Sequence, residues 1–377
     1  MRDLILASLA GLSFVLTAWR WIVGQRFPLH RPLAAAASLP GVTFLKPLKG
    51  CNAETAHCLR SWFGQRYPGA VQILCGVASA DDPVCPVVKE LMAEFPAVDA
   101  QLVICSQNLG TNGKVSTLRQ LEPHIHHPLI VLSDADVRVT PALAAQVTPL
   151  LADPGVGLAN CFYRLANPTT LAMRWEAVAI NADFWSQVLQ SKSLRPPDFA
   201  LGAVMSFSAV YLRKIGGFAP LAEYLADDYQ LGRHITQAGG RIELSTTVVD
   251  CREAPMAWPE VWAHQVRWAR TIRVCQPAPF FLSLLGNASL WPLLWLLFGR
   301  SPMSVPVWVA LLVFRTLTAA QQQSRLTQAR AHLPYWWMAP VKDLLDVLIW
   351  AAAFLGNHID WRGQRYRVLS DGKLLKV

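Results

Sequence analysis

The chain has 377 residues, of which 53% are hydrophobic and only 16% are charged. An average soluble domain carries about 25% charged residues, so this composition excludes a disordered chain and a coiled coil. The apolar character and the 15 tryptophans predict a globular domain joined to membrane segments. The net charge of +9 suits nucleic acid, anionic lipid or a phosphorylated substrate, and the predicted membrane segments disfavour nucleic acid as a partner.

An apolar segment near the amino terminus is long enough to cross a bilayer. The run Leu4–Trp19 is uncharged, and it extends to Val23 if the side chain of Arg20 reaches the headgroups. Because a small-residue cleavage site is missing, we expect a retained anchor and not a removed signal peptide. The basic residues Arg20, Arg26 and Arg31 predict that the chain continues into the cytoplasm.

Between residues 42 and 257, short β-branched runs alternate with segments of helical length. We expect strands at Val42–Leu48, Val71–Val77, Gln101–Cys105, Leu129–Leu132 and Val156–Phe162, and helices at Glu54–Phe63, Val84–Phe95 and Pro141–Leu151. The alternation predicts an α/β domain with a Rossmann-like, mostly parallel sheet that binds ligands beyond the carboxyl ends of its strands. The eight cysteines lack CxxC spacing, so we expect them to be reduced.

Three more apolar stretches precede a basic tail: Pro279–Phe298, Val305–Phe314 and Tyr335–Leu355. If the α/β domain and the tail are both cytoplasmic, an even number of crossings separates them, so we expect one stretch to be re-entrant or interfacial. The predicted parts are an anchor (1–25), a linker (26–41), the α/β domain (42–257), an interfacial helix (258–275), a membrane region (276–358) and a cytoplasmic tail (359–377). The chain is thus predicted to be multi-pass, in the inner membrane if the source is bacterial.

The most informative motif is a pair of acids at the end of a predicted buried strand. Asp134 and Asp136 follow the apolar run Leu129–Leu132 after one serine. A carboxylate at the carboxyl end of a parallel strand points into the ligand crevice, and a second one can hold a hard divalent cation that neutralises a diphosphate leaving group. Helix capping is the alternative, and the four apolar residues favour the functional interpretation.

Two further acidic pairs have competing interpretations. Asp82 follows Asp81 and precedes Pro83, so it either caps a helix or accepts a hydrogen bond from a nucleobase or ribose. Asp227 and Asp228 are adjacent, and their repulsion can raise the pKa of one carboxyl group enough for it to act as a general base. Taken alone, this second pair favours the alternative of a solvated helix start.

The segment Trp258–Val274 has the pattern of a helix that lies in a membrane interface. Apolar residues at positions 258, 262, 266 and 269 share one face, and arginines at 267, 270 and 273 follow another. The segment contains His264-Gln265-Val266-Arg267-Trp268. Its arginines point to headgroups or to a diphosphate, and a plain membrane-docking helix is the alternative.

In this order, the motifs resemble those of the inverting GT-A glycosyltransferases that modify lipids. More specifically, the chain is similar to the ceramide glucosyltransferases and their bacterial relatives in hopanoid synthesis. This resemblance extends from about Val42 to Arg367. It rests on the segments Leu45–Gly50, Asp81–Pro83, Leu225–Tyr229 and Trp361–Arg367.

The resemblance implies a UDP-sugar donor, a membrane lipid acceptor and a divalent cation, Mn²⁺ or Mg²⁺. Asp228 becomes the catalytic base and Asp136 the metal residue. The remaining assignments place Asp82, Asp134, Lys114 and Lys49 at the nucleotide sugar, and Asp227, His264, Arg267 and Trp268 on the diphosphate and acceptor side. His264 stands where the family has Gln or Arg, although a histidine can still donate a hydrogen bond.

The expected activity is transfer of glucose or N-acetylglucosamine to a lipid hydroxyl with inversion at the anomeric carbon. A ceramide-type acceptor is favoured, and a hopanoid of the bacteriohopanetetrol type is the alternative. A polysaccharide synthase is disfavoured because such enzymes need more spans. A non-catalytic membrane scaffold is the alternative from a different functional class. The sequence does not predict the oligomeric state.

Overall fold

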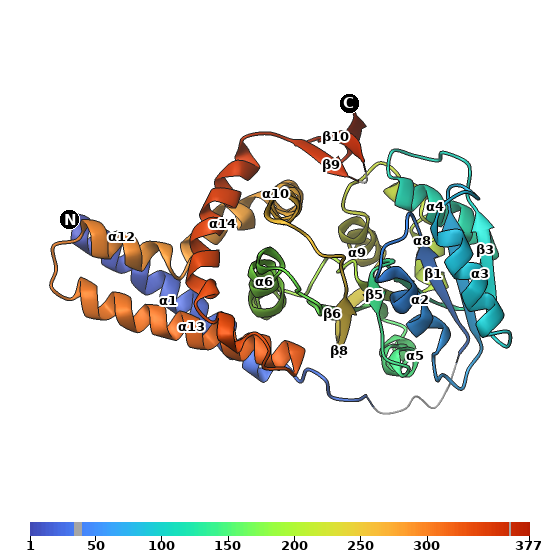
Figure 1. The fold of residues 1–377 in the computed structure, drawn as a ribbon, viewed down its shortest axis with the longest axis horizontal. Helices are drawn as coiled ribbons and strands as arrows, with labels where there is room; N and C mark the ends of the chain where they lie inside the picture. Colours follow the sequence, from blue (N-terminus) through green and yellow to red (C-terminus); the bar gives the residue numbers. More distant parts are fainter. Residues whose placement is uncertain (34–39, 362) are drawn as a thin grey trace.

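The computed structural model describes residues 1–33, 40–361 and 363–377. Residues 34–39 of the predicted linker and Arg362 of the tail motif lie outside these ranges. Figure 1 shows an α/β domain at one end of the molecule and a bundle of long helices, which includes the amino terminus, at the other. The small sheet near the carboxyl terminus lies close to the α/β domain, beside α9 and α10.

In the described ranges, the α/β domain contains one large mixed sheet in the order β3-β2-β1-β4-β7-β6-β8-β5. β1, β2, β3 and β4 run parallel, whereas β7 is antiparallel to β4 and β6, β8 is parallel to β6, and β5 is antiparallel to β8. The strands are β1 (Val42–Pro47), β2 (Val71–Val77), β3 (Asp99–Ile104), β4 (Leu129–Ser133), β5 (Val137–Arg138), β6 (Val156–Leu165), β7 (Val204–Ser208) and β8 (Arg241–Cys251). The predicted α/β class is confirmed, with a larger antiparallel part than expected.

Helices cover both faces of this sheet, and others lie in the predicted membrane region. The helices of the α/β domain are α2 (Thr55–Phe63), α3 (Val84–Glu94), α4 (Gly113–Leu121), α5 (Leu143–Val147), α6 (Leu171–Val178), α7 (Trp185–Leu194), α8 (Ala209–Lys214) and α9 (Asp227–Gln237). A π-helical turn, η3 (Ala179–Phe184), joins α6 to α7. The remaining elements are α1 (Arg2–Arg26), α10 (Trp258–Cys275), α11 (Pro277–Leu282), α12 (Leu290–Phe298), α13 (Ser304–Thr327), α14 (Met338–Phe354), β9 (His358–Trp361), β10 (Gln364–Val368) and β11 (Leu374–Lys376).

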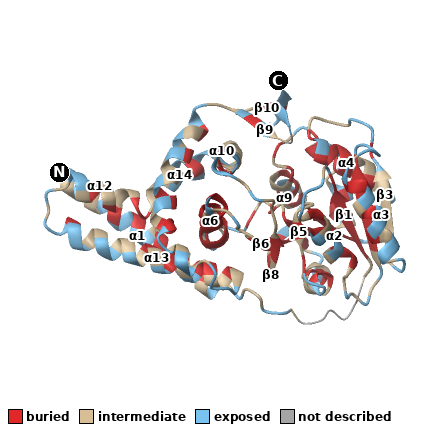
Figure 2. Ribbon diagram, viewed as in Figure 1, coloured by how far each residue is buried: buried red, intermediate tan, exposed pale blue. Residues whose placement is uncertain are grey.

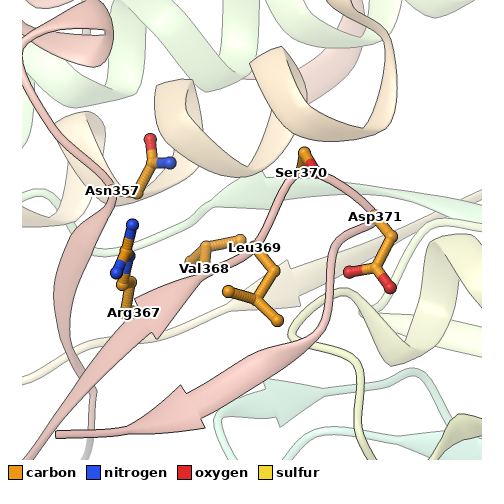
Figure 3. A pocket seen from close by; sticks show the side chains of 6 residues that line it. All are labelled: Asn357, Arg367, Val368, Leu369, Ser370 and Asp371. Atoms are coloured by element: carbon orange, nitrogen blue, oxygen red, sulfur yellow. The ribbon is translucent and has the colours of Figure 1, made fainter.

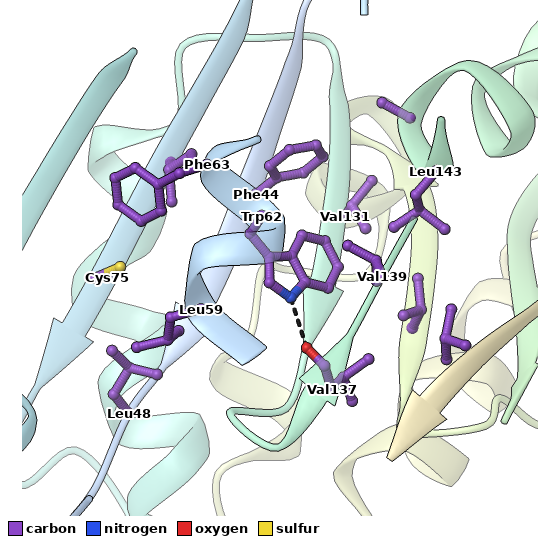
Figure 4. Close-up of a cluster of buried hydrophobic side chains, with 14 of the residues drawn as sticks. Phe44, Leu48, Leu59, Trp62, Phe63, Cys75, Val131, Val137, Val139 and Leu143 are labelled. Atoms are coloured by element: carbon purple, nitrogen blue, oxygen red, sulfur yellow. Dashed lines mark hydrogen bonds between the residues drawn. The ribbon is translucent and has the colours of Figure 1, made fainter. Parts of the chain in front are cut away.

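The sheet is buried between its helices, as the concentration of buried residues in Figure 2 shows. On one face, Trp62 of α2 packs against Phe44 of β1 with ring centres 5.2 Å apart (Figure 4). The indole N–H of Trp62 donates a hydrogen bond of 2.8 Å to the carbonyl of Val137 (Figure 4). Because Val137 directly follows Asp136, this contact fixes the chain just beyond the acid pair.

Helices α1, α12 and α13 pack together outside the α/β domain. In the described ranges, α1 and α13 are long and apolar enough to cross a membrane, and Pro277–Gly286 with Leu290–Phe298 forms a pair bent by 51° that could be a broken span or a re-entrant loop. Buried positions of α13 are mostly polar, while its exposed positions include Val305, Val309, Val313 and Leu317. Such an inside-out pattern is typical of a helix that faces lipid.

A buried ion network joins these helices to the α/β domain. Asp183 of η3 accepts hydrogen bonds from Arg315 of α13 at 2.8 and 3.0 Å and from Lys342 of α14 at 2.9 Å. Arg315 also binds Asp343 of α14 at 2.7 Å. The Arg20 guanidinium, 12% exposed, lies 3.4 Å from Asp183. The expectation that Arg20 reaches the headgroups is therefore wrong, because a buried carboxylate binds it inside the protein.

Candidate active site

Lys114 of α4 connects two carboxylates at the carboxyl edge of the sheet. Its Nζ is 2.8 Å from Oδ1 of Asp134, which follows β4, and 3.0 Å from Oδ2 of Asp227, which begins α9. The ammonium is only 6% exposed. Burial alone would lower the pKa of Lys114, but the two carboxylates raise it well above its usual value, so the lysine stays charged. Lys114 therefore joins the end of a strand to the start of a distant helix.

Asn112 holds this lysine in place. The Asn112 side chain accepts hydrogen bonds from the backbone N–H groups of Lys114 and Val115 at 3.0 and 3.2 Å, and so caps α4. Its amide group also donates to the carbonyl of Tyr224 at 2.7 Å, in the segment that leads to α9. The cap thus connects the start of α4 to the chain that carries Asp227.

Asp228 is the second residue of α9 and lies next to this ion pair. A Cβ on Gly202 would come within 2.9 Å of its Oδ2 and 3.6 Å of Oδ2 of Asp134, so only a glycine allows this close approach. The backbone N–H of Tyr229 donates to Asp228 Oδ1 at 2.7 Å. Burial, and then repulsion from Asp227, raise the pKa of Asp228 to about 7. Such a carboxyl group can accept a proton at neutral pH.

A second pair of acids lies near Asp134. Asp136 precedes β5 and Glu253 follows β8, and their carboxyl groups share a hydrogen bond. Burial and repulsion from Asp134 raise the pKa of Asp136. Burial and repulsion from Asp136 raise the pKa of Glu253 to about 8. Two carboxyl groups in this arrangement hold either a proton or a cation between them.

Asp136 and Glu253 fit a hard divalent cation, which prefers oxygen ligands. Across residues 1–33, 40–361 and 363–377, no group of three or more His, Cys, Asp or Glu side chains could hold a metal ion. Mg²⁺ is usually held by one or two carboxylates and completes its shell with substrate phosphates and water. A pair of carboxylates therefore suits a cation that arrives together with a diphosphate.

A buried lysine supports the end of β4. Lys46 of β1 donates from Nζ to Oγ of Ser133 at 3.2 Å and to the backbone carbonyl of Asp134. Its Nζ also lies 4.3 Å from the centre of the Trp62 ring. Burial lowers the pKa of Lys46 to about 8. The sequence patterns did not single out Lys46, although a lysine within an apolar strand is a visible signal.

Asp82 and Lys49 lie just beyond the carboxyl ends of β2 and β1. Both carboxylate oxygens of Asp82 accept from the N–H of Gly50 at 3.0 Å, and Oδ1 accepts from the N–H of Val84 at 3.0 Å. Asp82 therefore ties the first residue of α3 to the loop after β1. Lys49 is exposed in that loop. Their roles at the nucleotide stay predictions.

The motif of α10 is anchored on a buried acid, Glu176 of α6, which is 1% exposed. His264 Nδ1 and the side-chain amide of Gln265 bind one oxygen of Glu176 at 2.7 and 2.8 Å. The His264 ring packs edge-on against Trp268 with centres 4.6 Å apart. The positive charge of Arg267 acts on Glu253, so this side of α10 lies near the second acid pair.

The structure thus brings together most of the residues that the sequence singled out. The ones in direct or electrostatic contact are Lys114, Asp134, Asp136, Asp227, Asp228 and Arg267. Asp82 and Lys49 lie beyond neighbouring strands of the same sheet edge. The sequence patterns missed Glu253, Glu176 and Gly202. The signal for Glu253 was an acid two residues after the strand-like run that ends at Cys251.

A surface hollow of about 410 Å³ lies away from these acids, at the C-terminal sheet (Figure 3). It is lined by Asn357, Arg367, Val368, Leu369, Ser370 and Asp371. These residues include one aspartate and one arginine, but no pair of neighbouring carboxylates. The hollow therefore lacks the neighbouring carboxylates that the acid cluster at the sheet edge has.

The mixed sheet with helices on both faces has the GT-A fold. Among solved structures, a mannosyltransferase from Pyrobaculum calidifontis in complex with GDP-Man and Mn²⁺ has the same fold, with a TM-score of 0.53 and 18% sequence identity. The match covers 94% of this chain and 98% of the mannosyltransferase.

The chain belongs to glycosyl transferase family 21, whose family model matches residues 5–374. It is 21% identical over 370 residues to ceramide glucosyltransferase 3 of Caenorhabditis elegans, which covers 93% of this chain and 78% of that protein. It is also 33% identical over 108 residues to a ceramide glucosyltransferase of Candida albicans, covering 26% of this chain and 20% of the fungal protein. The resemblance noted in the sequence to ceramide glucosyltransferases is confirmed.

Proposed function

We propose that this glycosyltransferase moves a hexose, glucose or N-acetylglucosamine, from a UDP-sugar to the hydroxyl group of a membrane lipid. The observation that carries the proposal is the gathering of Asp134, Asp136, Asp227 and Asp228 at one sheet edge, next to a helix that packs on the membrane region. The ceramide glucosyltransferases among its relatives support a ceramide-type acceptor. A hopanoid acceptor is the alternative, and the lipid analysis described below distinguishes the two acceptors.

Asp228 acts as the general base. A lipid hydroxyl is a weak nucleophile at neutral pH, and a carboxyl group with a pKa of about 7 accepts its proton during attack. The hydroxyl oxygen forms a bond to the anomeric carbon while the bond from that carbon to the diphosphate oxygen breaks. Attack from the face opposite the nucleotide converts an α-linked donor into a β-linked product. The proton ends on Asp228 and the electron pair on the departing UDP.

Positive charge is needed where the diphosphate leaves. Asp136 and Glu253 would hold a divalent cation. When bound there, the cation would neutralise negative charge on the diphosphate. Arg267, whose charge already acts on Glu253, adds to that neutralisation from α10. Lys114 is engaged by Asp134 and Asp227, and so orients the acids that surround the sugar.

The donor is polar and the acceptor is buried in lipid, so the site must lie where the two phases meet. The helices α1 and α13, with the bent pair Pro277–Gly286 and Leu290–Phe298 that precedes α13, would anchor the chain as a multi-pass protein, with the GT-A domain in the cytoplasm. The exposed Trp258 at the start of α10 suits an interfacial position. In a bacterium this membrane is the inner one.

Lipid mass spectrometry of a host that expresses the chain tests this proposal. The host is supplied in parallel with a ceramide and with bacteriohopanetetrol, and Asp228→Asn is the matched control. We expect one new hexosyl lipid with the wild-type chain and none with the variant. Absence of any hexosyl lipid, together with absence of cation-dependent transfer from radiolabelled UDP-hexoses in membranes, would favour a scaffold without catalysis and refute the proposal.

A further inference from the structure

The small C-terminal sheet, defined as β9, β10 and β11, has one buried and one exposed face. β10 pairs with β9 and β11, both antiparallel. Tyr366, Val368 and Leu374 are buried, whereas their neighbours Arg367 and Leu375 are exposed. This alternation is the pattern of a sheet that packs on another part of the protein with one side.

The buried face packs on the chain that leads to the proposed base. Ile359, Tyr366, Val368 and Leu374 form one apolar cluster with Leu225, which lies three residues before Asp228. Val274, at the end of α10, packs against the same cluster. The C-terminal sheet therefore contacts both α10 and the segment before α9.

Backbone hydrogen bonds add to this apolar contact. The N–H of Leu225 donates to the carbonyl of Gly372 at 3.2 Å, and the N–H of Leu374 donates to the carbonyl of Glu223 at 2.7 Å. Tyr224 and Lys373 form an antiparallel bridge between these bonds. The segment 223–225 is thus paired with the carboxyl-terminal chain as if it were one more short strand.

Other elements hold the start of α9 on its remaining sides. Asn112 of the α4 cap binds the carbonyl of Tyr224, as described above. On the other flank of the base, the hydroxyl of Tyr229 donates to the carbonyl of Cys275 at 3.0 Å and accepts from the side chain of Gln276 at 3.0 Å. Residues 223–225 are thus held by Asn112 on one side and by the C-terminal sheet on another. The C-terminal sheet is the more distant of the two in the sequence.

We propose that the C-terminal sheet positions the base, with Leu374 as the positioning residue whose burial locks residues 223–225 and hence Asp228. The inference rests on the proposed function, because it takes Asp228 as the base. A side chain displaced by about 1 Å can cost a transfer reaction roughly 100-fold in rate. The buried face of the basic tail, expected from the sequence to be a cytoplasmic extension, thereby positions the base without touching the reacting atoms.

Two neighbouring leucines give a matched test. Leu374 is 4% exposed and Leu375 is 51% exposed, so Leu374→Ser disturbs the packing whereas Leu375→Ser does not. The full-length variants are purified in lipid nanodiscs, and kcat is expressed per UDP-binding site so that unfolded protein does not count. We expect Leu374→Ser to lower kcat roughly 10- to 100-fold with the donor KM unchanged. Leu374→Ile is expected to restore kcat, and Leu375→Ser to equal wild type.

The outcomes separate this inference from the proposed function. Equal kcat per binding site for Leu374→Ser and Leu375→Ser, with an active wild-type chain, would overturn the positioning role alone. A rise in donor KM with unchanged kcat would overturn it as well. If Leu374→Ser does not accumulate, Leu374→Ala is judged by the same criteria. Absence of transfer by the wild-type chain would refute the proposed function and this inference with it.

Discussion

Replacing Asp228 with asparagine removes a base and preserves nearly all of its shape. The asparagine oxygen can still accept from the N–H of Tyr229, but the amide cannot take a proton from a hydroxyl group. General base catalysis contributes roughly 10²- to 10⁴-fold. At about 1.4 kcal/mol for each factor of ten, Asp228→Asn should raise the activation free energy by about 3 to 5 kcal/mol. Donor binding should stay within a few fold.

The pH profile gives this prediction a second, independent readout. The groups that face Asp228 are the carboxylates of Asp227 and Asp134, which raise its pKa, and the ammonium of Lys114, which lowers it. With burial they leave the pKa at about 7, so the ionised base is present above that pH and is lost below it. The wild-type kcat should therefore fall roughly tenfold for each pH unit below 7.

The assay measures transfer from radiolabelled UDP-glucose to a saturating lipid acceptor in nanodiscs between pH 5.5 and 8.5. Asp228→Asn should show a low rate that lacks the acid limb, which is the fall of kcat below pH 7. Asp227→Asn removes a repelling charge, so the acid limb should move to lower pH. Normal turnover by Asp228→Asn, or an acid limb that stays in that variant, would refute the assignment of the base.

Three further predictions concern the surroundings of the base. Asp136→Ala should raise the Mn²⁺ concentration needed for half-maximal activity roughly tenfold or more, and an unchanged metal titration would remove Asp136 from the metal site. Lys114→Met leaves the buried carboxylate of Asp227 and the partly exposed one of Asp134 without this counter-charge, so the temperature of unfolding should fall and the KM for the UDP-sugar should rise; a variant as stable as wild type would contradict this. Arg315→Met breaks the buried network and should lower the free energy of unfolding by about 3 to 5 kcal/mol, measured by thermal unfolding in detergent. The control is Val313→Ala at an exposed position of the same helix, and equal stability of the two variants would contradict the expectation.

Local sequence patterns predicted much of the fold because a buried strand or helix face requires apolar residues at regular positions in a short segment. The apolar run Val71–Val77 is a strand with the expected limits, and the expected interfacial helix 258–275 also has the limits observed for α10, Trp258–Cys275. The direction of β7 could not be predicted in this way. It runs antiparallel between β4 and β6, and a run of apolar residues has no feature that indicates the direction of its partners.

The acids were predictable where two of them stand close together in the sequence and unpredictable where their partners are remote. Asp134 and Asp228 occur in recognisable pairs, and the sheet brings them together. Glu176 and Asp183 lie inside a helical stretch, and their burial depends on α10, α13 and α14, which are far away in the sequence. The partner of Arg20 was equally unpredictable, because it is the distant Asp183 and not a headgroup.

The anomeric configuration of the product tests the central claim most directly. The purified wild-type chain in nanodiscs receives an α-linked UDP-hexose and a short-chain lipid acceptor, and proton NMR determines the linkage in the isolated product. A single displacement assisted by Asp228 predicts a β-linked hexosyl lipid. An α-linked product, or no hexosyl lipid from any UDP-hexose, would contradict the claim that this acid cluster performs an inverting transfer.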